Sequence, residues 1–563
     1  MGPNTSINEE AARMIASAEE NNQDTLNEIL TIVKRIDEAS RPQQPTLSQT
    51  FRSYDGSANN VYHPRWGKAH ENQVRDSAAD YDPNTETAVR GGSNPNPRII
   101  SNSICQGTSL PSANQLSDIA WAWGQFLDHE LDLVPTQNED PQKYPVPETL
   151  NMTTPTVQED PNELYPSRTI PFTRSEFEKI QGIREQPNAI SSYVDATNLY
   201  GCCVDRAYAL RRFDGTGKLN TTFADNSEVL PPRNTEGLPN AAPSGSTPSD
   251  FFLCGDVRSN ENALLTAMHT LFIREHNRLC DNIATQPEFA GKDELIFQKA
   301  RRCISGMMQW ITYNEFLPAL IGQDRVSAIL ALSYNSSVDA SISTEFSTVG
   351  YRIGHTMVSS NLALGPQAAS SVALRDVFFT PAYIQQNGCD ALLIGATKQV
   401  SQEIDGIIVE DLRSFLFEAP TVSLLHDLAS LNMQRGRDHG IGGYNELRQA
   451  YGLSRIASFA EIPTSVENQN KLQALYDSVD DIDPWIGGII ETHASGSAAG
   501  PLFTEIIRTQ FEKLKTGDYY WFERDPVFTA DEIASIKQTT LKDILVRNTQ
   551  YSASQFNDNV FKI

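Results

Sequence analysis

The stretch WAWGQFLDHELDL at residues 121–133 places side chains that could do chemistry within an otherwise apolar segment. If the stretch is helical, Gln125 and His129 share one face because they are four residues apart, and Asp128 lies on the neighbouring face. Histidine can accept and return a proton near neutral pH, as general acid–base catalysis requires. A histidine on an apolar helix is more often a packed core residue, so this stretch by itself leaves both interpretations open.

A second segment, GDVRSNE, places a cation and a carboxylate at the start of a predicted long helix. Ser259 or Asn260 is the predicted cap of that helix, and Arg258 lies just before its N-terminus. Glu261 falls in the predicted first turn, where the helix dipole favours the ionised carboxylate. The alternative is a surface arginine with an acidic residue that only complements the dipole.

A third segment, VGYRIGHTMVSSNL at residues 349–362, places a histidine among glycines. Gly350 and Gly354 lower helix stability, and their presence near His355 is explained if a flat, bulky group approaches the backbone there. Arg352 could hold an anionic group at that surface. The alternative is a close contact between helices that the glycines permit.

A fourth segment, LNMQRGRDHG, brings Asn432, Arg435 and Arg437 together before a glycine-rich turn. An asparagine oxygen can accept a hydrogen bond from an imidazole N–H, and arginines pair with carboxylates. Together the four segments supply a His–Gln–Arg set and a separate histidine with an asparagine partner. This combination suits a haem peroxidase, in which one histidine binds iron and another moves the protons of H2O2.

The elements that must position these residues are predominantly helical. A helix is predicted from Ala113 to about Leu133, because Ser112 and Gln115 match a capping box and Pro135 follows the last turn. Elsewhere, helical patterns alternate with loops rich in proline and acidic residues, and alternating strand patterns are scarce. The sequence therefore predicts a mainly α fold with little β structure.

The chain divides into a short N-terminal part and one large body. Residues 8–38 show an amphipathic helical pattern, and a linker rich in Pro, Gln and Ser follows. We expect residues 1–48 to form a helical extension and linker, and residues 49–563 to form a single large helical domain.

Composition limits the partners of the chain. Its 563 residues carry a formal net charge of -26, so nucleic acid and anionic lipid are not expected to bind. No apolar run approaches the length of a membrane span, and the N-terminus lacks the basic and apolar segments of a signal peptide. The seven cysteines are an odd, sparse set in a long chain, which argues against a disulfide framework. They include no CxxC pair, which argues against a cysteine zinc site.

The four segments resemble motifs of the animal-type haem peroxidases, the myeloperoxidase and lactoperoxidase group of the peroxidase–cyclooxygenase superfamily. DGSANN, SSYVDATNLYG, MHTLFIREHNRL and DPWIGG resemble further motifs of this family. The resemblance extends from about residue 50 to residue 550 in the order of the family. It implies the animal haem peroxidase fold and a protein that is secreted or extracellular.

On one side of a haem, the resemblance implies a complete catalytic set. His129 matches the distal acid–base residue, Gln125 its neighbour on the halide and peroxide side, and Arg258 the distal cation. Asp128 and Glu261 match the two carboxylates that become ester-linked to methyl groups of haem b.

On the other side, the resemblance implies the iron ligand and its partners. His355 matches the proximal ligand, Asn432 its hydrogen-bond acceptor, and Arg352 a contact to a haem propionate. Asn262 stands where some members of the family form a methionine sulfonium link, so two ester links at most are expected here.

The family also binds calcium next to the distal histidine. The matching ligands are Ser191, the carbonyl of Tyr193, Asp195 and Thr197, which alternate along SSYVDATN as an oxygen cage requires. Glu130 stands where the family has an aspartate, and it is the fifth expected ligand.

These resemblances predict a peroxidase that reduces H2O2 and oxidises halides, thiocyanate and small phenolic donors through an oxoferryl intermediate. One alternative is a fatty-acid dioxygenase of the cyclooxygenase-like branch. That chemistry needs a tyrosine three residues before the proximal histidine, where this chain has Arg352, and Tyr351 lies one place off. A second alternative is a non-catalytic adhesion or structural protein on a peroxidase fold.

Overall fold

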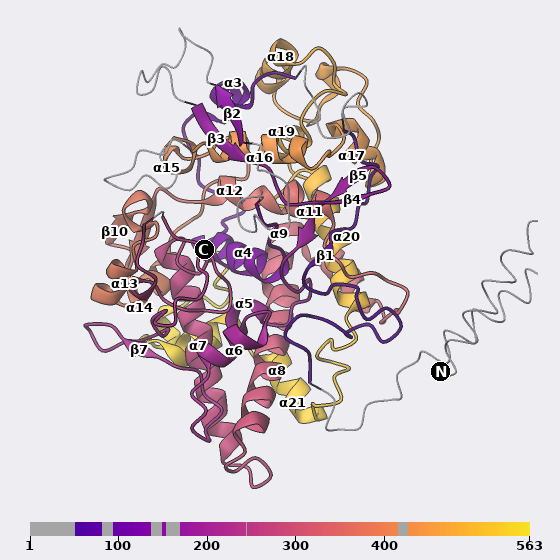
Figure 1. Cartoon of the computed structure of the whole chain (residues 1–563). Coiled ribbons are helices and arrows are strands. Elements are labelled where there is room, and N and C mark those ends of the chain that lie inside the picture. Colours follow the sequence, from indigo (N-terminus) through magenta and orange to yellow (C-terminus); the bar gives the residue numbers. More distant parts are fainter. Residues whose placement is uncertain (1–50, 82–93, 137–148, 154–168, 244, 415–425) are drawn as a thin grey trace, which may run out of the picture.

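The computed structural model describes residues 51–563 except 82–93, 137–148, 154–168, 244 and 415–425. Within these residues the chain is mainly helical, as predicted, and helices surround a central group that includes α4 and α7 (Figure 1). The predicted extension at residues 1–48 lies outside the described residues. Among the described residues, no helix is both long enough and apolar enough to cross a membrane.

Four long helices form the framework of the body. They are α4 (Asp118–Leu131), α7 (Ala263–Ala284), α8 (Asp293–Ile311) and α20 (Pro501–Gly517). α7 packs against both α8 and α4, and nearly the whole length of α7 is buried. A helix buried on most sides must lie at the centre of a domain, and α4 beside it is therefore held rigidly.

Shorter helices complete the body. They are α3 (Pro97–Ile100), α5 (Thr197–Tyr200), α6 (Val204–Leu210), α9 (Leu317–Ile321), α10 (Gln323–Ala331), α11 (Thr344–Thr348), α12 (Gly354–Met357), α13 (Pro381–Asn387), α14 (Asp390–Ala396), α15 (Glu410–Arg413), α16 (Leu428–Asp438), α17 (Tyr444–Ala450), α18 (Val466–Leu475), α19 (Pro484–Ile489), α21 (Ala530–Gln538) and α22 (Leu541–Asn548). The π-helical turns are η2 (Ser101–Cys105) and η4 (Thr312–Phe316), and the 3-10 turns are η3 (Pro248–Asp250), η5 (Gly350–Ile353), η6 (Leu374–Val377), η7 (Phe459–Glu461) and η8 (Ala553–Gln555).

The strands of the described residues form two-stranded antiparallel pairs and no larger sheet. The pairs are β1 (Glu71–Asn72) with β6 (Pro187–Asn188), β2 (Thr149–Thr153) with β3 (Thr169–Thr173), β4 (Glu178–Ile180) with β5 (Ile183–Glu185), β7 (Thr222–Phe223) with β8 (Val229–Leu230), and β9 (Asn361–Leu364) with β10 (Ser370–Ala373). Asn361 pairs with Ala373 at one end of the β9–β10 ladder. The strands thus serve as local hairpins and edge contacts around a helical core.

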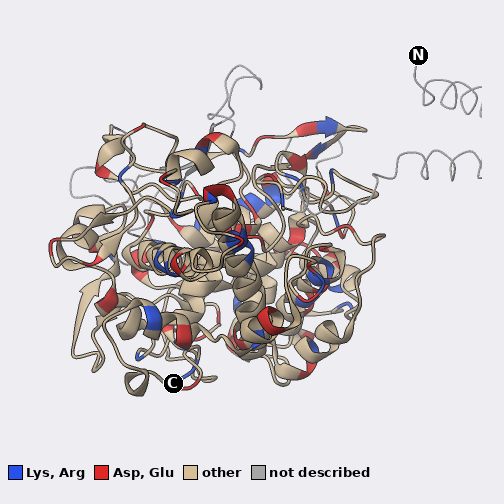
Figure 2. Cartoon of the chain, turned by 90° about the horizontal axis from the view of Figure 1, so that it is seen from below, with Lys and Arg blue, Asp and Glu red and all other residues tan. Residues whose placement is uncertain are grey.

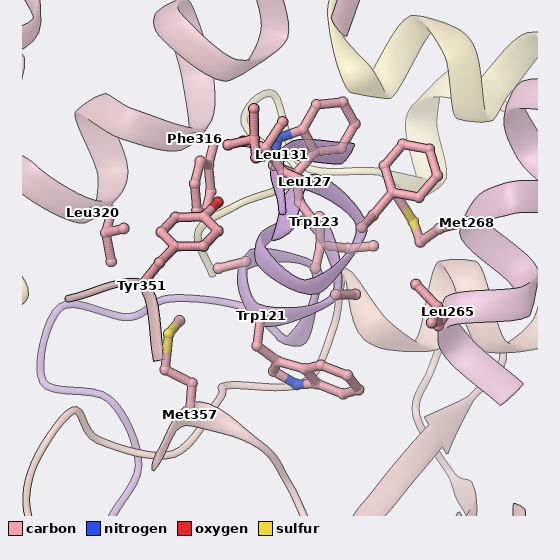
Figure 3. Close-up of a cluster of buried hydrophobic side chains, with 14 of the residues drawn as sticks. Trp121, Trp123, Leu127, Leu131, Leu265, Met268, Phe316, Leu320, Tyr351 and Met357 are labelled. Carbon is pink, nitrogen blue, oxygen red and sulfur yellow. The ribbon is translucent and has the colours of Figure 1, made fainter. Parts of the chain in front are cut away.

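The core around α4 combines apolar side chains from several distant segments (Figure 3). Trp123 is fully buried, and its ring lies 5.7 Å from Phe272 of α7 and 6.0 Å from Phe561 near the C-terminus. Figure 3 also shows that other side chains of this cluster come from α4, α7, η4, α9 and the η5–α12 segment: Trp121, Leu127, Leu131, Leu265, Met268, Phe316, Leu320, Tyr351 and Met357. This packing fixes α4 relative to the segment that carries His355.

The start of α4 differs from the prediction. The helix begins at Asp118, and Gln115 has a φ of 55°, a left-handed conformation that cannot continue a right-handed helix. Ser117, the residue before the helix, instead forms a bridge with Val400. The predicted end near Leu133 is close to the observed end at Leu131.

The start of α7 differs as well. Its cap is Asn262, whose side chain accepts a hydrogen bond from the N–H of Leu265 at 2.9 Å. Asn260 is unavailable as a cap because its side chain bonds both the N–H and the carbonyl of Phe252. Glu261 therefore precedes the helix rather than lying in its first turn.

Lys, Arg, Asp and Glu residues are dispersed over the elements of the body rather than gathered on one helix (Figure 2). Many of these charges form pairs inside the body, and Arg98 with Asp427 at 2.7 Å is one example in which both side chains are almost fully buried. Buried charges of this kind are tolerated only when paired.

Candidate active site

A cavity of about 380 Å³ lies in the centre of the body and collects the predicted haem-site residues. One part of its wall consists of α4 and the segment before α7, with Gln125, Asp128, His129, Arg258 and Glu261. The η5–α12 segment forms another part, with Arg352, Gly354 and His355. Asn432 of α16 does not line the cavity, but its side chain contacts His355. The four predicted segments, which are far apart in the sequence, thus converge at this cavity.

The distal residues surround His129, which is only 4% exposed. Burial, followed by the positive charge of Arg258, lowers the pKa of His129 well below its usual value. The imidazole is therefore neutral at physiological pH and can accept a proton. Arg258 donates to the carbonyl of Asp132 at 2.9 Å, and its Nη1 lies 3.9 Å from Oδ2 of Asp128.

Two carboxyl groups face the cavity from this side. The side chain of Asp128 keeps 31% of its surface accessible even though it belongs to a central helix, because it faces the hollow. Burial raises the pKa of Glu261 to about 7. The sequence-based expectation that the helix dipole favours an ionised Glu261 is thus wrong, since burial dominates and the residue lies outside the helix.

Gln125 is fixed by hydrogen bonds at both ends of its amide. Its Nε2 donates to Oε1 of Glu261 at 3.1 Å, and its Oε1 accepts from Nδ2 of Asn262 at 2.9 Å. The sequence placed Gln125 beside His129, but it did not indicate that Asn262 holds the amide. Asn262 is well suited to this contact because it also caps α7.

The proximal histidine has the predicted asparagine partner in a different orientation. Nδ1 of His355 lies 2.9 Å from Nδ2 of Asn432, while Oδ1 of Asn432 accepts from Arg352 at 3.1 Å. An arginine can only donate, so it draws the amide oxygen and leaves the amide nitrogen facing His355. In this structure Asn432 is therefore not the acceptor that the sequence predicted. Burial and the charge of Arg352 lower the pKa of His355 to about 3.

The two glycines near His355 have different neighbours. A Cβ atom on Gly350 would lie 2.4 Å from Cγ2 of Ile506, so this glycine permits a helix contact with α20. A Cβ atom on Gly354 would meet nothing within 4 Å, and Gly354 lines the cavity. The helix-contact explanation is therefore confirmed for Gly350, and the approach of a flat group stays a prediction for Gly354. The open surface at Gly354, in the cavity that His129 and His355 both line, fits a flat group such as haem.

The residues predicted to bind calcium lie together beside α4. Glu130 accepts hydrogen bonds from the backbone N–H groups of Asp195 at 2.6 Å, Asn198 at 2.8 Å and also Ala196. Ala196 has a φ of 67°, and successive N–H groups in such a turn converge on an anion. Glu130 thus holds the backbone of this loop.

The remaining predicted calcium ligands lie on the same loop. Ser191 donates to Oδ2 of Asp195 at 2.9 Å, and Thr197 donates to Oδ1 of Asp195. The carbonyl of Tyr193 accepts the N–H of Asp195 at 3.0 Å. Four oxygen-bearing groups on alternate residues are suitable ligands for Ca2+, so the donor chemistry fits.

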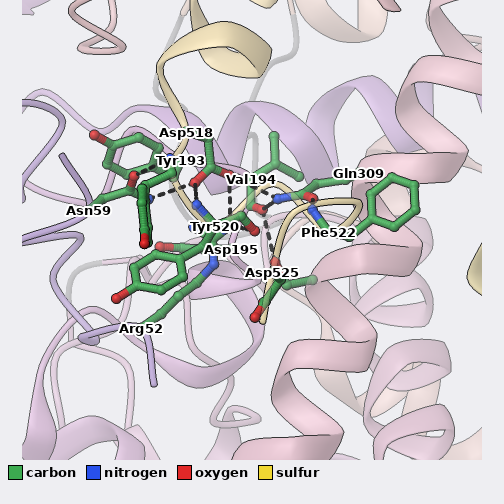
Figure 4. Close-up of polar contacts among 12 residues, drawn as sticks. Arg52, Asn59, Tyr193, Val194, Asp195, Gln309, Asp518, Tyr520, Phe522 and Asp525 are labelled. Carbon is green, nitrogen blue, oxygen red and sulfur yellow. Dashed lines mark hydrogen bonds and ion pairs between the residues drawn. The ribbon is translucent and has the colours of Figure 1, made fainter. Parts of the chain in front are cut away.

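A buried polar network holds the loop from its other side (Figure 4). The carbonyl of Val194 accepts from Gln309 of α8 at 2.9 Å, and Gln309 also donates to Asp518 at 3.1 Å. Asp518 in turn bonds Arg52 at 2.6 Å and Asn59 at 2.8 Å. Segments that are several hundred residues apart thereby fix the loop beside α4.

Several residues near the cavity were not assigned from the sequence. Asp132, Arg435 and His439 line it, and Asp256 contacts both His129 and Arg258. The only signal for Asp256 was its place two residues before Arg258 in GDVRSNE. Arg437, by contrast, pairs with Asp483 at 2.6 Å and does not line the cavity.

A fatty-acid dioxygenase shares the fold of this chain. A fatty acid alpha-dioxygenase from Arabidopsis thaliana superposes with a TM-score of 0.75, covering 95% of this chain and 88% of that one, at 17% identity. At such identity the likeness shows the fold alone. Position 352, three residues before His355, is an arginine that bonds Asn432, so the tyrosine expected for dioxygenase chemistry is absent there.

The more similar proteins are peroxidases. The family model for animal haem peroxidases matches residues 51–561. Peroxinectin A of Dictyostelium discoideum is 33% identical over 533 residues, which cover 92% of this chain and 96% of that relative. The solved structure of peroxidase A from the same organism gives a TM-score of 0.81 at 30% identity, covering 92% of this chain and 100% of that one. The chain therefore belongs to the animal haem peroxidase family and is a haem-dependent peroxidase.

Proposed function

We propose that the cavity holds haem b between His129 and His355 and that the protein oxidises small anionic and phenolic donors with H2O2. The observation that carries this proposal is the placement of two histidines from different helices on one cavity, His129 beside the charge of Arg258 and His355 beside the amide of Asn432. When bound, the haem iron supplies the electrons that cleave the peroxide and recovers them from the donor.

On the distal side, the residues move protons and stabilise charge. His129 accepts a proton from the inner oxygen of H2O2 and returns it to the outer oxygen, which leaves as water. Arg258 stabilises the negative charge that develops on that oxygen, and it keeps His129 neutral beforehand. Gln125, held by Glu261 and Asn262, presents a fixed amide edge to the peroxide or a halide.

On the proximal side, His355 would hold the iron through its Nε2, and its Nδ1 would then carry a hydrogen that needs an acceptor. Turning the Asn432 amide over would supply that acceptor. We propose that Arg352, which now occupies the amide oxygen, engages a haem propionate instead and thereby frees the amide to turn.

Asp128 and Glu261 are the proposed sites of ester links to the haem. Both carboxyl groups line the cavity, and burial raises the pKa of each, which keeps a larger fraction in the neutral form. Mass spectrometry of the haem released by proteolysis tests this proposal. Dihydroxylated haem from the native protein, and singly modified haem from Asp128→Asn or Glu261→Gln, are expected, whereas unmodified haem alone contradicts both links.

We also propose that Ca2+ binds Ser191, the Tyr193 carbonyl, Asp195 and Thr197, with Glu130 acting chiefly through the backbone N–H groups that it holds. Metal analysis of the purified holoenzyme should then find about one calcium per chain. Asp195→Asn should remove it, whereas Glu130→Asp, which keeps a carboxylate beside the loop, should retain it. Native protein free of calcium contradicts the proposal.

Rapid mixing of the ferric holoenzyme with H2O2 tests the proposed catalytic role of His129. His129→Ala should slow the reaction with peroxide by roughly 100- to 10,000-fold, because general acid–base catalysis contributes that much. His63→Ala is the control, since His63 is an exposed histidine stacked on Trp66. Near-normal turnover of His129→Ala would contradict the assignment.

A further inference from the structure

Asp256 is a buried carboxylate that lies directly behind the distal residues and is only 3% exposed. Its backbone N–H donates to the carbonyl of Asn198 at 2.7 Å. The preceding Gly255 packs so closely on the chain that an added Cβ would lie 2.4 Å from the backbone nitrogen of Gly201. The backbone therefore fixes where this carboxylate can lie.

The carboxylate contacts both catalytic side chains. Its Oδ1 accepts from the backbone N–H of Arg258 at 2.8 Å and from Nε at 2.9 Å, and its Oδ2 accepts from Nη2 at 2.8 Å. Oδ1 also lies 3.6 Å from Nδ1 of His129, a buried nitrogen that makes no hydrogen bond within the described part of the chain. Such catalytic contacts are often long without substrate and shorten in the reacting complex.

Electrostatics agrees with this geometry. Burial raises the pKa of Asp256, but the charge and hydrogen bonds of Arg258 outweigh burial and hold that pKa below its usual value. Asp256 is therefore ionised and can only accept hydrogen bonds. A histidine whose Nδ1 faces an acceptor carries its hydrogen there and keeps the lone pair of Nε2 free.

We infer that Asp256 is a positioning residue for peroxide reduction, which fixes the tautomer and orientation of His129 and clamps the guanidinium of Arg258 beside it. The inference rests on the proposed roles of His129 and Arg258. One carboxylate thus sets the base that takes the peroxide proton and the cation that stabilises the leaving oxygen. If Asp256 only formed a structural ion pair, it would hold Arg258 and would have no effect on His129.

Asp483 offers a matched control in the same chain. It is also buried, and it accepts from Nε of Arg437 at 2.8 Å and from Nη2 at 2.6 Å. Asp483→Asn therefore removes a buried bidentate carboxylate that does not line the cavity. The effect of Asp483→Asn thus measures the general structural cost of replacing a buried, arginine-bound aspartate by asparagine. Any further effect of Asp256→Asn is due to its place beside His129.

The rate of the ferric holoenzyme with H2O2 and its affinity for cyanide, a probe that also delivers a proton on binding, are the two readouts. Asp256→Asn should lower both by roughly 10- to 100-fold, since a hydrogen bond to a charged group contributes a free energy of that size. Asp483→Asn should change neither by more than about threefold. Equal values for the two variants would overturn the inference.

Proton NMR of the cyanide complex of the native holoenzyme adds a readout that does not depend on a variant that folds. A signal from a hydrogen on Nδ1 of His129 is expected, and a ring without that hydrogen overturns the inference. His129→Ala separates the two levels of the argument. If that variant reacts normally with H2O2, the proposed site itself fails; if it is slow while Asp256→Asn equals Asp483→Asn, only the role of Asp256 fails.

Discussion

The two histidines of the cavity have the same side chain but are supported in opposite ways. His129 belongs to α4, a helix of 14 residues, and faces an ionised Asp256 through its Nδ1. His355 belongs to α12, a helix of four residues, and faces the neutral amide of Asn432. Burial lowers the pKa of both, so burial does not distinguish their roles. What distinguishes them is the charge of the group that faces Nδ1, an ionised carboxylate for His129 and a neutral amide for His355.

This difference predicts that removing the positive charge beside His129 affects the peroxide step without loosening the haem. Arg258→Leu removes the cation beside His129, and it should slow the reaction with H2O2 by roughly 100- to 1,000-fold, the usual effect of losing a group that stabilises developing charge. The absorption spectrum of the ferric haem should remain that of the native protein. If Arg258→Leu instead loses haem while the remaining holoprotein reacts normally, the two sides are not functionally separate.

Changes on the proximal side should have the opposite effect. Asn432→Ala removes the partner of His355 and should lower haem affinity by roughly 10- to 100-fold, as is usual when the hydrogen-bond partner of a metal-bound histidine is lost. Asn432→Asp, which keeps an acceptor, should restore haem binding and lower the reduction potential of the iron. Haem titration and spectroelectrochemistry measure the two effects.

The glycines near His355 give a smaller and more specific test of the proximal wall. Gly350→Ala places a methyl group 2.4 Å from Ile506, and it should cost about 1–3 kcal/mol of folding stability through overpacking. Gly354→Ala meets no protein atom and should leave the stability of haem-free protein almost unchanged while lowering haem content. Denaturant unfolding and the haem-to-protein ratio distinguish the two variants. Similar losses of stability would contradict the assignment of Gly354 to the haem surface.

The sequence predicted the residue types of the site better than the elements that carry them. His129, Arg258 and His355 all line the cavity, as the motifs that carry them predicted. The predicted helix starts were wrong at Ala113 and at Ser259 or Asn260. Gln115 is left-handed and the side chain of Asn260 already bonds Phe252, and both overrule the local capping pattern. Such overrides depend on distant contacts that a sequence pattern does not contain.

The partners of the site residues were the least predictable part. The sequence paired Asn432 with His355 correctly, but the orientation of the amide depends on Arg352, which is 80 residues away in the chain. Glu130 stays a predicted calcium ligand, but the sequence did not indicate that its oxygens bond three backbone N–H groups of the loop around Ala196, which has a left-handed φ. Hydrogen-bond partners depend on backbone geometry, and residue type constrains that geometry only loosely.

The smallest predicted effect concerns Glu261, a distal carboxyl group with no counterpart among the proximal partners Asn432 and Arg352. Burial raises its pKa from the usual 4.5 to about 7, so the folded protein keeps the proton over a pH range in which the unfolded chain has lost it. The stability that this proton contributes is therefore fully present below about pH 4.5 and is lost as the pH rises to about 7. In haem-free protein, Glu261→Gln should flatten that part of the curve of Tm against pH.

Glu315→Gln is the control, because Glu315 is a buried carboxyl group outside the cavity whose pKa is also raised to about 7. It should flatten the curve similarly but leave the haem linkage of the holoenzyme intact. An unchanged curve in Glu261→Gln would show that the cavity hydrates this carboxyl group and that the distal wall is more polar than its buried histidine indicates.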